Sequence, residues 1–252
     1  MKWTTIRPNV NLLAFIFLLP AGLLLALACK KKDNFTRNMP AIPVNSDSVT
    51  SKDTIQYLAL GDSYTIGTSV DEKDRYPVQT VAILKNQGIN IAAADIIATN
   101  GWTTADLANS IGKSSFTNSY DAVSLLIGVN NQYQGRSIEE YKMQFASLVE
   151  RAIQFAKGKP GHVIVLSIPD YSVTPFASGS NKVKIAAEID AFNEANKTIS
   201  DTYHVQYLYI TDESRRAAND LSLVASDGLH FSGKEYNVWA GKLAPIIKGL
   251  VQ

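Results

Sequence analysis

The chain has 252 residues, of which 46% are hydrophobic and 19% are charged, and its formal net charge is +1. A chain of this length and apolar content is expected to fold around one sizeable core. The near-neutral charge gives no electrostatic reason to expect a nucleic-acid partner. Cys29 is the single cysteine, which excludes an internal disulfide.

The N-terminal residues predict export and a lipid anchor. Lys2 and Arg7 precede an uncharged stretch over residues 9–28, whose length lies between a signal-peptide core and a short membrane span. The stretch ends in "ALAC", which resembles the lipobox of bacterial lipoproteins and would make Cys29 the lipid-modified first residue. Three lysines follow, and because positive charge tends to stay on the cytoplasmic side, an uncleaved anchor or an ordinary signal peptide is the alternative.

The following residues are polar as far as residue 54, with two prolines and no sustained apolar period. This composition is typical of a flexible tether. We therefore expect a signal peptide over residues 1–28, a tether over 29–54 and a folded domain over 55–252. The lipoprotein interpretation places this domain outside the cytoplasm on a membrane, in the periplasm or at the cell surface.

From residue 55 onward, short apolar runs alternate with longer segments of helical periodicity. The runs are rich in Ile, Val and Leu without strict alternation, as is typical of parallel strands covered on both faces. They span residues 55–60, 94–98, 122–127, 163–168 and 205–210. The helical segments span residues 77–87, 104–111, 138–156, 183–201 and 233–250. This alternation predicts an α/β fold with a doubly wound parallel sheet, and we expect a flavodoxin-like three-layer α/β/α sandwich with strand order 2-1-3-4-5.

Two of the helical segments begin with capping-box signals. Ser137 with Glu140 and Ser232 with Glu235 have the required spacing. The second box is expected to fix the backbone just before the last helix.

Polar residues follow three of the predicted strands. Ser63, in "GDSY", follows the first strand, Gly101 follows the second, and Asn130 follows the third. Ligands of doubly wound sheets bind at the loops that leave the carboxyl ends of the strands. We therefore expect these three residues to share one rim of the sheet.

Only one of the three histidines is expected to reach this rim. His162 and His204 precede the fourth and fifth strands and belong to the opposite rim, whereas His230, in "DGLH", follows the last strand. Asp227 lies three residues before His230, a spacing that can bring its carboxylate onto the imidazole. Such a carboxylate favours the imidazolium that forms when the histidine takes a serine proton, so Ser63, Asp227 and His230 are the candidate catalytic residues.

Three polar hydrogens on this rim are candidates for stabilising an oxyanion. They belong to the backbone N–H groups of Ser63 and Gly101 and to the side-chain amide of Asn130. Gly101 lies near the start of a predicted helix, where the dipole favours negative charge. Each such donor typically contributes about 3–4 kcal/mol of transition-state stabilisation.

The blocks "GDSYTIG", "NGWTT", "GVNN" and "DGLH" resemble the ordered blocks of the SGNH hydrolases, also called the GDSL esterase/lipase family. They occur in the family's order and span nearly the whole chain after the tether. The resemblance implies a flavodoxin-like sandwich and hydrolysis of carboxylic esters. It assigns the family's serine, glycine, asparagine, histidine and acid to Ser63, Gly101, Asn130, His230 and Asp227.

One position departs from the family's pattern. The third block usually reads Gly-x-Asn-Asp, and Asn131 stands where that aspartate would be. Because the family's aspartate supports the loop, the departure concerns the geometry of this loop more than the chemistry.

The expected reaction is ester hydrolysis through an acyl-serine intermediate, for which we expect no metal or organic cofactor. Aromatic residues near the predicted rim are candidates for substrate binding, or they simply pack among the loops: Trp102, Tyr133, Tyr171 and Phe176. The loops are short and no hydrophobic lid is apparent. This favours small or single-chain acyl esters, of the lysophospholipid or O-acetylated glycan type, over triglycerides.

Two other functions stay open at this point. A non-catalytic, surface-anchored module would bind glycans or lipids in the same pocket. A transacylase would use the same residues and differ only in the access of water. The expected partners are an ester substrate and, through the lipid anchor, a membrane.

Overall fold

The computed structural model describes residues 54–113 and 119–252. The predicted signal peptide, Cys29 and the tether as far as residue 53 lie outside the described residues.

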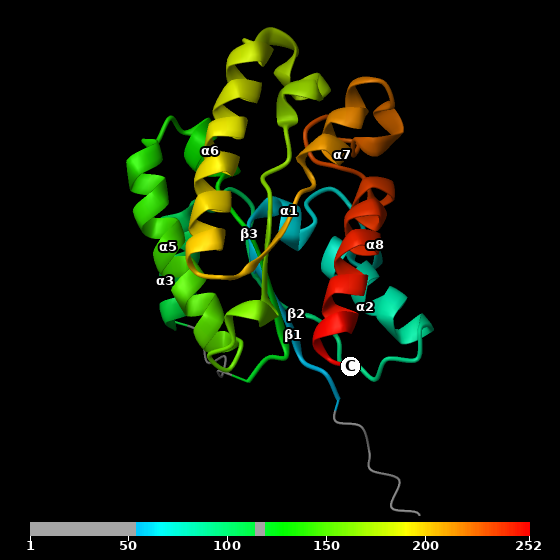
Figure 1. The fold of residues 1–252 in the computed structure, drawn as a ribbon. Coiled ribbons are helices and arrows are strands. Elements are labelled where there is room, and N and C mark those ends of the chain that lie inside the picture. Colours follow the sequence, from blue (N-terminus) through cyan, green and yellow to red (C-terminus); the bar gives the residue numbers. More distant parts are fainter. Residues whose placement is uncertain (1–53, 114–118) are drawn as a thin grey trace, which may run out of the picture. The chain divides into compact units, whose positions relative to one another are not determined.

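A parallel sheet forms the centre of the fold (Figure 1). Its strands are β1 (Tyr57–Gly61), β2 (Asp95–Ala98), β3 (Ala122–Leu126), β4 (Val163–Leu166) and β5 (Gln206–Leu208). The strand order is β2-β1-β3-β4-β5, with every neighbouring pair parallel, which confirms the predicted fold and order. Each strand is shorter than the apolar run that predicted it, and β1 also ends one residue later than its run. The remaining apolar residues of the runs lie outside the strands, in the adjoining segments of the chain.

Helices cover both faces of this sheet, which gives the three predicted layers. They are α1 (Ser63–Ile66), α2 (Tyr76–Asn86), α3 (Thr104–Lys113), α4 (Val129–Tyr133), α5 (Ile138–Phe155), α6 (Lys182–Thr202), α7 (Thr211–Arg215) and α8 (Gly233–Leu250). In Figure 1, α2 and α8 pack together on one side, and α3, α5 and α6 lie on the other. The three shortest helices, α1, α4 and α7, were not predicted, since four or five residues are too few to show a helical period.

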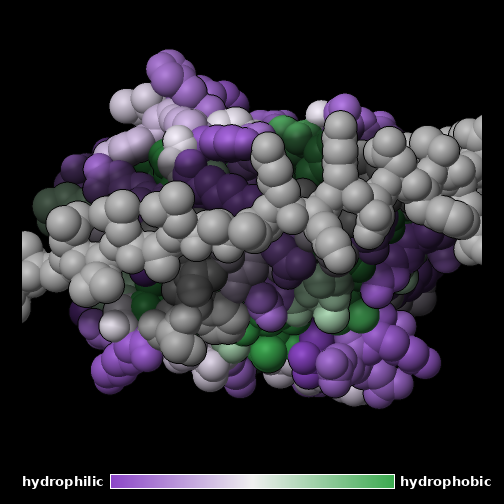
Figure 2. Space-filling model, turned by 90° about the horizontal axis from the view of Figure 1, so that it is seen from below, coloured by the Kyte–Doolittle hydropathy of each residue, from purple (hydrophilic) through white to green (hydrophobic). Residues whose placement is uncertain are grey.

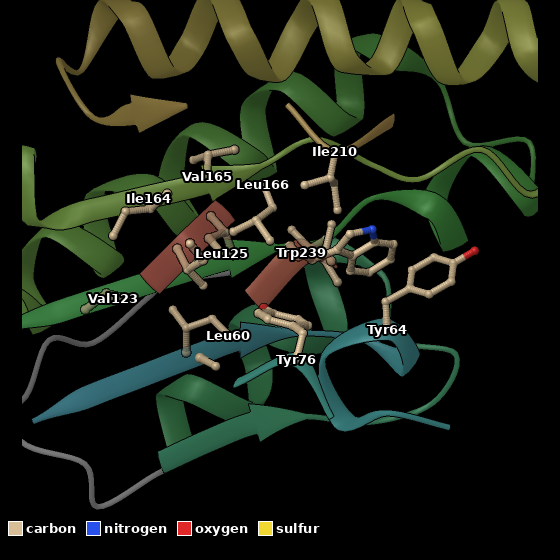
Figure 3. Close-up of a cluster of buried hydrophobic side chains, with 14 of the residues drawn as sticks. Leu60, Tyr64, Tyr76, Val123, Leu125, Ile164, Val165, Leu166, Ile210 and Trp239 are labelled. Carbon is tan, nitrogen blue, oxygen red and sulfur yellow. The ribbon is translucent and has the colours of Figure 1, made fainter. Parts of the chain in front are cut away.

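The core lies on both sides of the central strands. Every residue of β1, β3 and β4 is buried, which explains why their sequences do not alternate between polar and apolar residues. Figure 3 shows side chains of these strands packed against Tyr76 of α2 and Trp239 of α8. Burying one large aliphatic side chain contributes about 1.5–3 kcal/mol, so these strands contribute much of the stability.

One of the two predicted capping boxes is wrong. Ser137 caps α5, since its Oγ accepts a hydrogen bond from the N–H of Glu140 at 3.2 Å. The Oγ of Ser232 instead donates to the carbonyl oxygen of Ser222 at 2.7 Å, and it does not cap α8. Glu235 is buried and accepts a hydrogen bond from the indole N–H of Trp239 at 2.7 Å. A partner in the preceding loop therefore takes the Ser232 side chain away from the helix start, and a partner one turn further along α8 takes that of Glu235.

Hydrophilic residues predominate among the coloured atoms of the face in Figure 2. Over the described ranges, no helix combines the length and the apolar character that a membrane crossing requires.

Candidate active site

A cavity of about 300 Å³ lies beyond the carboxyl ends of β1 and β3. Its polar lining residues are Ser63, Asn100, Asn130 and His230. The fold therefore brings the predicted serine, asparagine and histidine to one cavity from segments that are far apart in the sequence.

Ser63 is held firmly at the start of α1. The Oδ1 atom of Asp62 accepts a hydrogen bond from the N–H of Tyr64 at 3.0 Å and so caps this short helix. The helix ends at Gly67, whose φ of 70° is favourable for glycine. The N–H groups of Gly67 and Thr68 both donate to the carbonyl oxygen of Ser63 at 3.0 Å. The Ser63 residue is only 4% exposed, so its hydroxyl reaches solvent only through the cavity.

Asp227 contacts the imidazole of His230 directly. Nδ1 of His230 lies 2.6 Å from Oδ2 of Asp227, and Oδ1 accepts from the N–H groups of Leu229 and His230 at 2.9 Å each. Ser69 donates its hydroxyl to Oδ2 at 2.6 Å. Partial burial raises the pKa of Asp227, but the hydrogen bonds from Ser69, His230 and the backbone outweigh it and hold this pKa well below its usual range. Because Asp227 is ionised, Nδ1 donates to it and Nε2 of the neutral ring is an acceptor.

The backbone around His230 is fixed by a β-bridge between Val224 and Phe231. The N–H of Ala225 donates to the carbonyl oxygen of His230 at 2.8 Å. The ring of Tyr64 also packs edge-on against the imidazole, with centroids 5.7 Å apart. These contacts take the place of the capping box that the sequence predicted.

The other two histidines lie at the amino ends of strands, as expected. Nδ1 of His162 lies 2.7 Å from the carbonyl oxygen of Asp121, just before β3, and His204 precedes β5. Within the described residues, no group of three or more His, Cys, Asp or Glu side chains could hold a metal ion.

The predicted oxyanion donors lie on neighbouring loops. Nδ2 of Asn130 donates to the carbonyl oxygen of Trp102 at 2.9 Å, which ties the loop after β2 to the loop after β3. Gly101 has a φ of 81°, which favours glycine there. Gly101 does not line the cavity, although its neighbour Asn100 does.

Three of the four predicted aromatic residues line the cavity, and Trp102 does not. Tyr133, Tyr171 and Phe176 pack on one another with ring centroids 6.1–6.3 Å apart. Tyr171 is buried, whereas Tyr133 is 60% and Phe176 is 45% exposed. Trp102 instead lines a separate pocket along the edge strand β2. We call Tyr133, Tyr171 and Phe176 the aromatic wall.

Sequence reasoning missed several lining residues. Tyr64 follows the candidate nucleophile, Val129 precedes Asn130, and Leu229 precedes His230. Their adjacency to motif residues was the available signal. In Figure 3, Tyr64 lies beside Trp239 at the edge of the core, so its ring joins the core to the cavity.

Asn131 supports the loop after β3 despite its departure from the family's pattern. It is fully buried, its Oδ1 accepts from the N–H of Thr104 at 3.0 Å, and its Nδ2 donates to the hydroxyl of Thr104 at 2.8 Å. The Thr104 hydroxyl in turn donates to Gln144. The amide therefore joins this loop to the start of α3.

Comparison with known proteins agrees with this architecture. Residues 59–238 match the sequence profile of the GDSL-like Lipase/Acylhydrolase family. No curated protein sequence matches the chain.

Several solved structures share the fold. A lipase/acylhydrolase from Enterococcus faecalis is 17% identical, with a TM-score of 0.60 over 78% of this chain and 96% of that chain. An acetylxylan esterase from Geobacillus stearothermophilus is 20% identical, with a TM-score of 0.60 over 78% of this chain and 96% of that one. A member of the lipolytic G-D-S-L family from Veillonella parvula is 18% identical, with a TM-score of 0.61 over 77% and 99% of the two chains. Since the profile match extends over more than half of the sequence, the chain belongs to the GDSL-like lipase/acylhydrolase family.

Proposed function

We propose that the protein is a serine esterase that hydrolyses carboxylic esters through an acyl-serine intermediate. Family membership and the esterase fold support ester hydrolysis in general. The observation that carries the serine mechanism is that Ser63 and His230 line one cavity, while Asp227 holds His230 at 2.6 Å.

The proposed chemistry follows from this arrangement. Nε2 of His230 takes the hydroxyl proton of Ser63 as Oγ bonds to the ester carbon, and the carbonyl electrons move onto oxygen. The amide of Asn130 and the N–H of Ser63, two residues that line the cavity, stabilise this oxyanion, and the N–H of Gly101, beside the lining residue Asn100, is the third proposed donor. When the carbonyl reforms, the C–O bond to the alcohol breaks, and His230 gives its proton to the leaving alcohol. Water then attacks the carbonyl carbon of the acyl-serine while Nε2 of His230 takes a proton from it. The C–O bond to Ser63 breaks, Oγ regains the proton from His230, and the carboxylic acid leaves.

The cavity favours a small ester. Its volume of about 300 Å³ is at the lower end of the range of about 300–1,000 Å³ for small-molecule sites. The aromatic wall adds an apolar surface beside Ser63, which suits a short acyl chain or a flat alcohol part. Of the expected substrate types, we therefore propose small esters with a short acyl chain, of the O-acetylated glycan type, rather than the lysophospholipid type.

A fluorophosphonate probe tests the serine mechanism. We expect the probe to label the wild-type protein at Ser63 and to leave Ser63→Ala unlabelled. Labelling at another residue, or no labelling of a folded wild-type protein, would contradict the proposal; the second result would favour the non-catalytic binding module. Measuring free acid against acylated acceptor in the products separates hydrolysis from acyl transfer.

A series of p-nitrophenyl esters of increasing acyl length tests the substrate class. We expect kcat/KM to be highest for short chains, and Phe176→Ala to shift this preference towards longer ones by removing part of the wall. Val183 is 81% exposed and does not line the cavity, so Val183→Ala is the matched control. A wild-type preference for long chains would contradict the proposal.

We also propose that Cys29 carries a lipid that anchors the protein to a membrane outside the cytoplasm. The support is the lipobox-like "ALAC". In cells fed labelled palmitate, the full chain should incorporate label and sediment with membranes, and Cys29→Ser should not incorporate label. Incorporation into Cys29→Ser would contradict the proposal.

A further inference from the structure

Ser69 makes a hydrogen bond that links two segments which lie far apart in the sequence and which both contribute residues to the cavity. Its hydroxyl donates to Oδ2 of Asp227 at 2.6 Å, and the same oxygen lies 2.6 Å from Nδ1 of His230. The two other donors to Asp227 are the N–H groups of Leu229 and His230, in its own turn. Among the hydrogen bonds in the described part of the chain, Ser69 therefore provides the contact to Asp227 that comes from another segment.

The segment that carries Ser69 is the one that carries Ser63. The N–H of Thr68 donates to the carbonyl oxygen of Ser63 at 3.0 Å, and the N–H of Val70 donates to that of Gly67 at 3.3 Å. These bonds fix the turn between Ser63 and Ser69. Thr68, whose N–H binds the Ser63 carbonyl oxygen, is covalently joined to Ser69, and the Ser69 hydroxyl binds Asp227, which in turn contacts His230.

The backbone of Ser69 is in an unfavourable conformation for a serine. Its φ is 67°, and the other non-glycine residues with positive φ in the described ranges are Lys157 and His204. Both of those follow the ends of long helices, where the left-handed conformation is common. Ser69 does not follow a helix end in this way, because Gly67 is the residue that ends α1 and Ser69 lies two residues further on. Strain of this kind persists where surrounding contacts determine the conformation, and it gathers at functional sites.

The exposure of Asp227 explains why such a contact matters. Its side chain is 30% exposed, so water competes for its oxygens, whereas the His230 side chain is 9% exposed. A fixed hydroxyl on Oδ2 limits rotation of the carboxylate and keeps it aimed at Nδ1. Small displacements of a catalytic base reduce the rate strongly.

We propose that Ser69 is a positioning residue that fixes Asp227, and through it His230, relative to the nucleophile Ser63. This inference rests on the proposed esterase function. It predicts that the hydroxyl of residue 69 controls kcat, while the backbone conformation of residue 69 controls stability.

Two substitutions separate these effects. Ser69→Gly removes the hydroxyl but suits the positive φ, so we expect kcat for p-nitrophenyl acetate to fall about tenfold with KM unchanged and Tm preserved. Ser69→Thr keeps the hydroxyl but places a β-branched residue at positive φ, so we expect kcat within about twofold of wild type and a lower Tm. A merely structural role would make activity follow stability. Wild-type kcat in Ser69→Gly, or a greater loss of kcat in Ser69→Thr than in Ser69→Gly, would overturn the proposal.

His204→Gly is the matched control for the backbone change. His204 is exposed, has a φ of 56° and lies at the opposite end of the sheet, so this variant measures the effect of glycine at positive φ without touching the cavity. We expect its kcat to equal that of wild type.

Fluorophosphonate labelling distinguishes failure of this inference from failure of the proposed function. If the wild-type protein does not label at Ser63, the esterase proposal fails. If the wild type labels and Ser69→Gly labels at the same rate, only the role of Ser69 fails. We expect slower labelling of Ser69→Gly, and loss or broadening of the low-field proton resonance of His230 Nδ1 in its NMR spectrum.

Discussion

The side-chain amide of Asn130 donates a hydrogen bond to the backbone carbonyl oxygen of Trp102 at 2.9 Å. This bond uses one of the two amide hydrogens and fixes the orientation of the group. The second hydrogen remains for the cavity that Asn130 lines together with Ser63. Donors oriented in advance stabilise a developing charge without reorganisation during the reaction.

Asn130→Ala is therefore expected to lower kcat for p-nitrophenyl acetate by about 10²–10³-fold. KM should change little, because the donor acts on the oxyanion more than on the bound ester. Steady-state kinetics measure both constants. A higher KM with an unchanged kcat would show that Asn130 binds the ground state instead.

His230→Ala is expected to lower kcat by about three to six orders of magnitude without unfolding the domain. In the proposed mechanism the imidazole accepts and returns the serine proton, and His230 is the one histidine among the described residues that line the cavity. His162→Ala is the control, since His162 lies before β4 at the opposite end of the sheet. An equal loss of kcat in both variants would contradict the proposed base.

Asn131→Ala is expected to lower the free energy of unfolding by about 1–3 kcal/mol, because it leaves the buried N–H of Thr104 without its partner. Asn131→Asp restores an acceptor at the start of α3, where negative charge is favourable, and should lose less. Asn86→Ala, at an exposed helical position, is the control. Urea denaturation measures all three, and equal losses in Asn131→Ala and Asn86→Ala would sink the prediction.

Asp62 should make stability depend on pH. Burial raises its pKa to about 7, and its hydrogen bonds with the backbone lower it only in part. Its Oδ2 has no hydrogen-bond partner among the described residues. An unfolded aspartate has a pKa of about 3.9. Between about pH 4 and pH 7 the folded state keeps a proton that the unfolded state has lost, so the free energy of unfolding falls as pH rises.

The slope from this group is at most about 1.4 kcal/mol per pH unit. Asp62→Asn keeps the acceptor for the N–H of Tyr64 and removes the titration, so its stability should depend less on pH. Urea denaturation across this interval compares the two proteins. Identical slopes would show that Asp62 does not carry the proton.

Much of the fold could be predicted from local pattern. Apolar runs without alternation identified strands buried on both faces, and their alternation with helical segments required parallel connections. The direction of each strand then placed Ser63 and Asn130 at the carboxyl ends of β1 and β3, and His162 at the amino end of β4. These results need no knowledge of distant contacts, because strand direction alone decides which rim a loop occupies.

The tertiary structure decided which side chains meet across those loops. The hydroxyl of Ser69 reaches Asp227 across 158 residues, and neither "TSVD" nor "SDGLH" signals this pairing. Ser232 and Glu235 have the sequence spacing of a capping box, yet the Ser232 hydroxyl donates to the carbonyl oxygen of Ser222 instead. Trp102 lies next to Gly101 in sequence but faces a different pocket. Periodicity and turn chemistry are local properties, whereas the partner of a polar side chain depends on the path of every neighbouring loop.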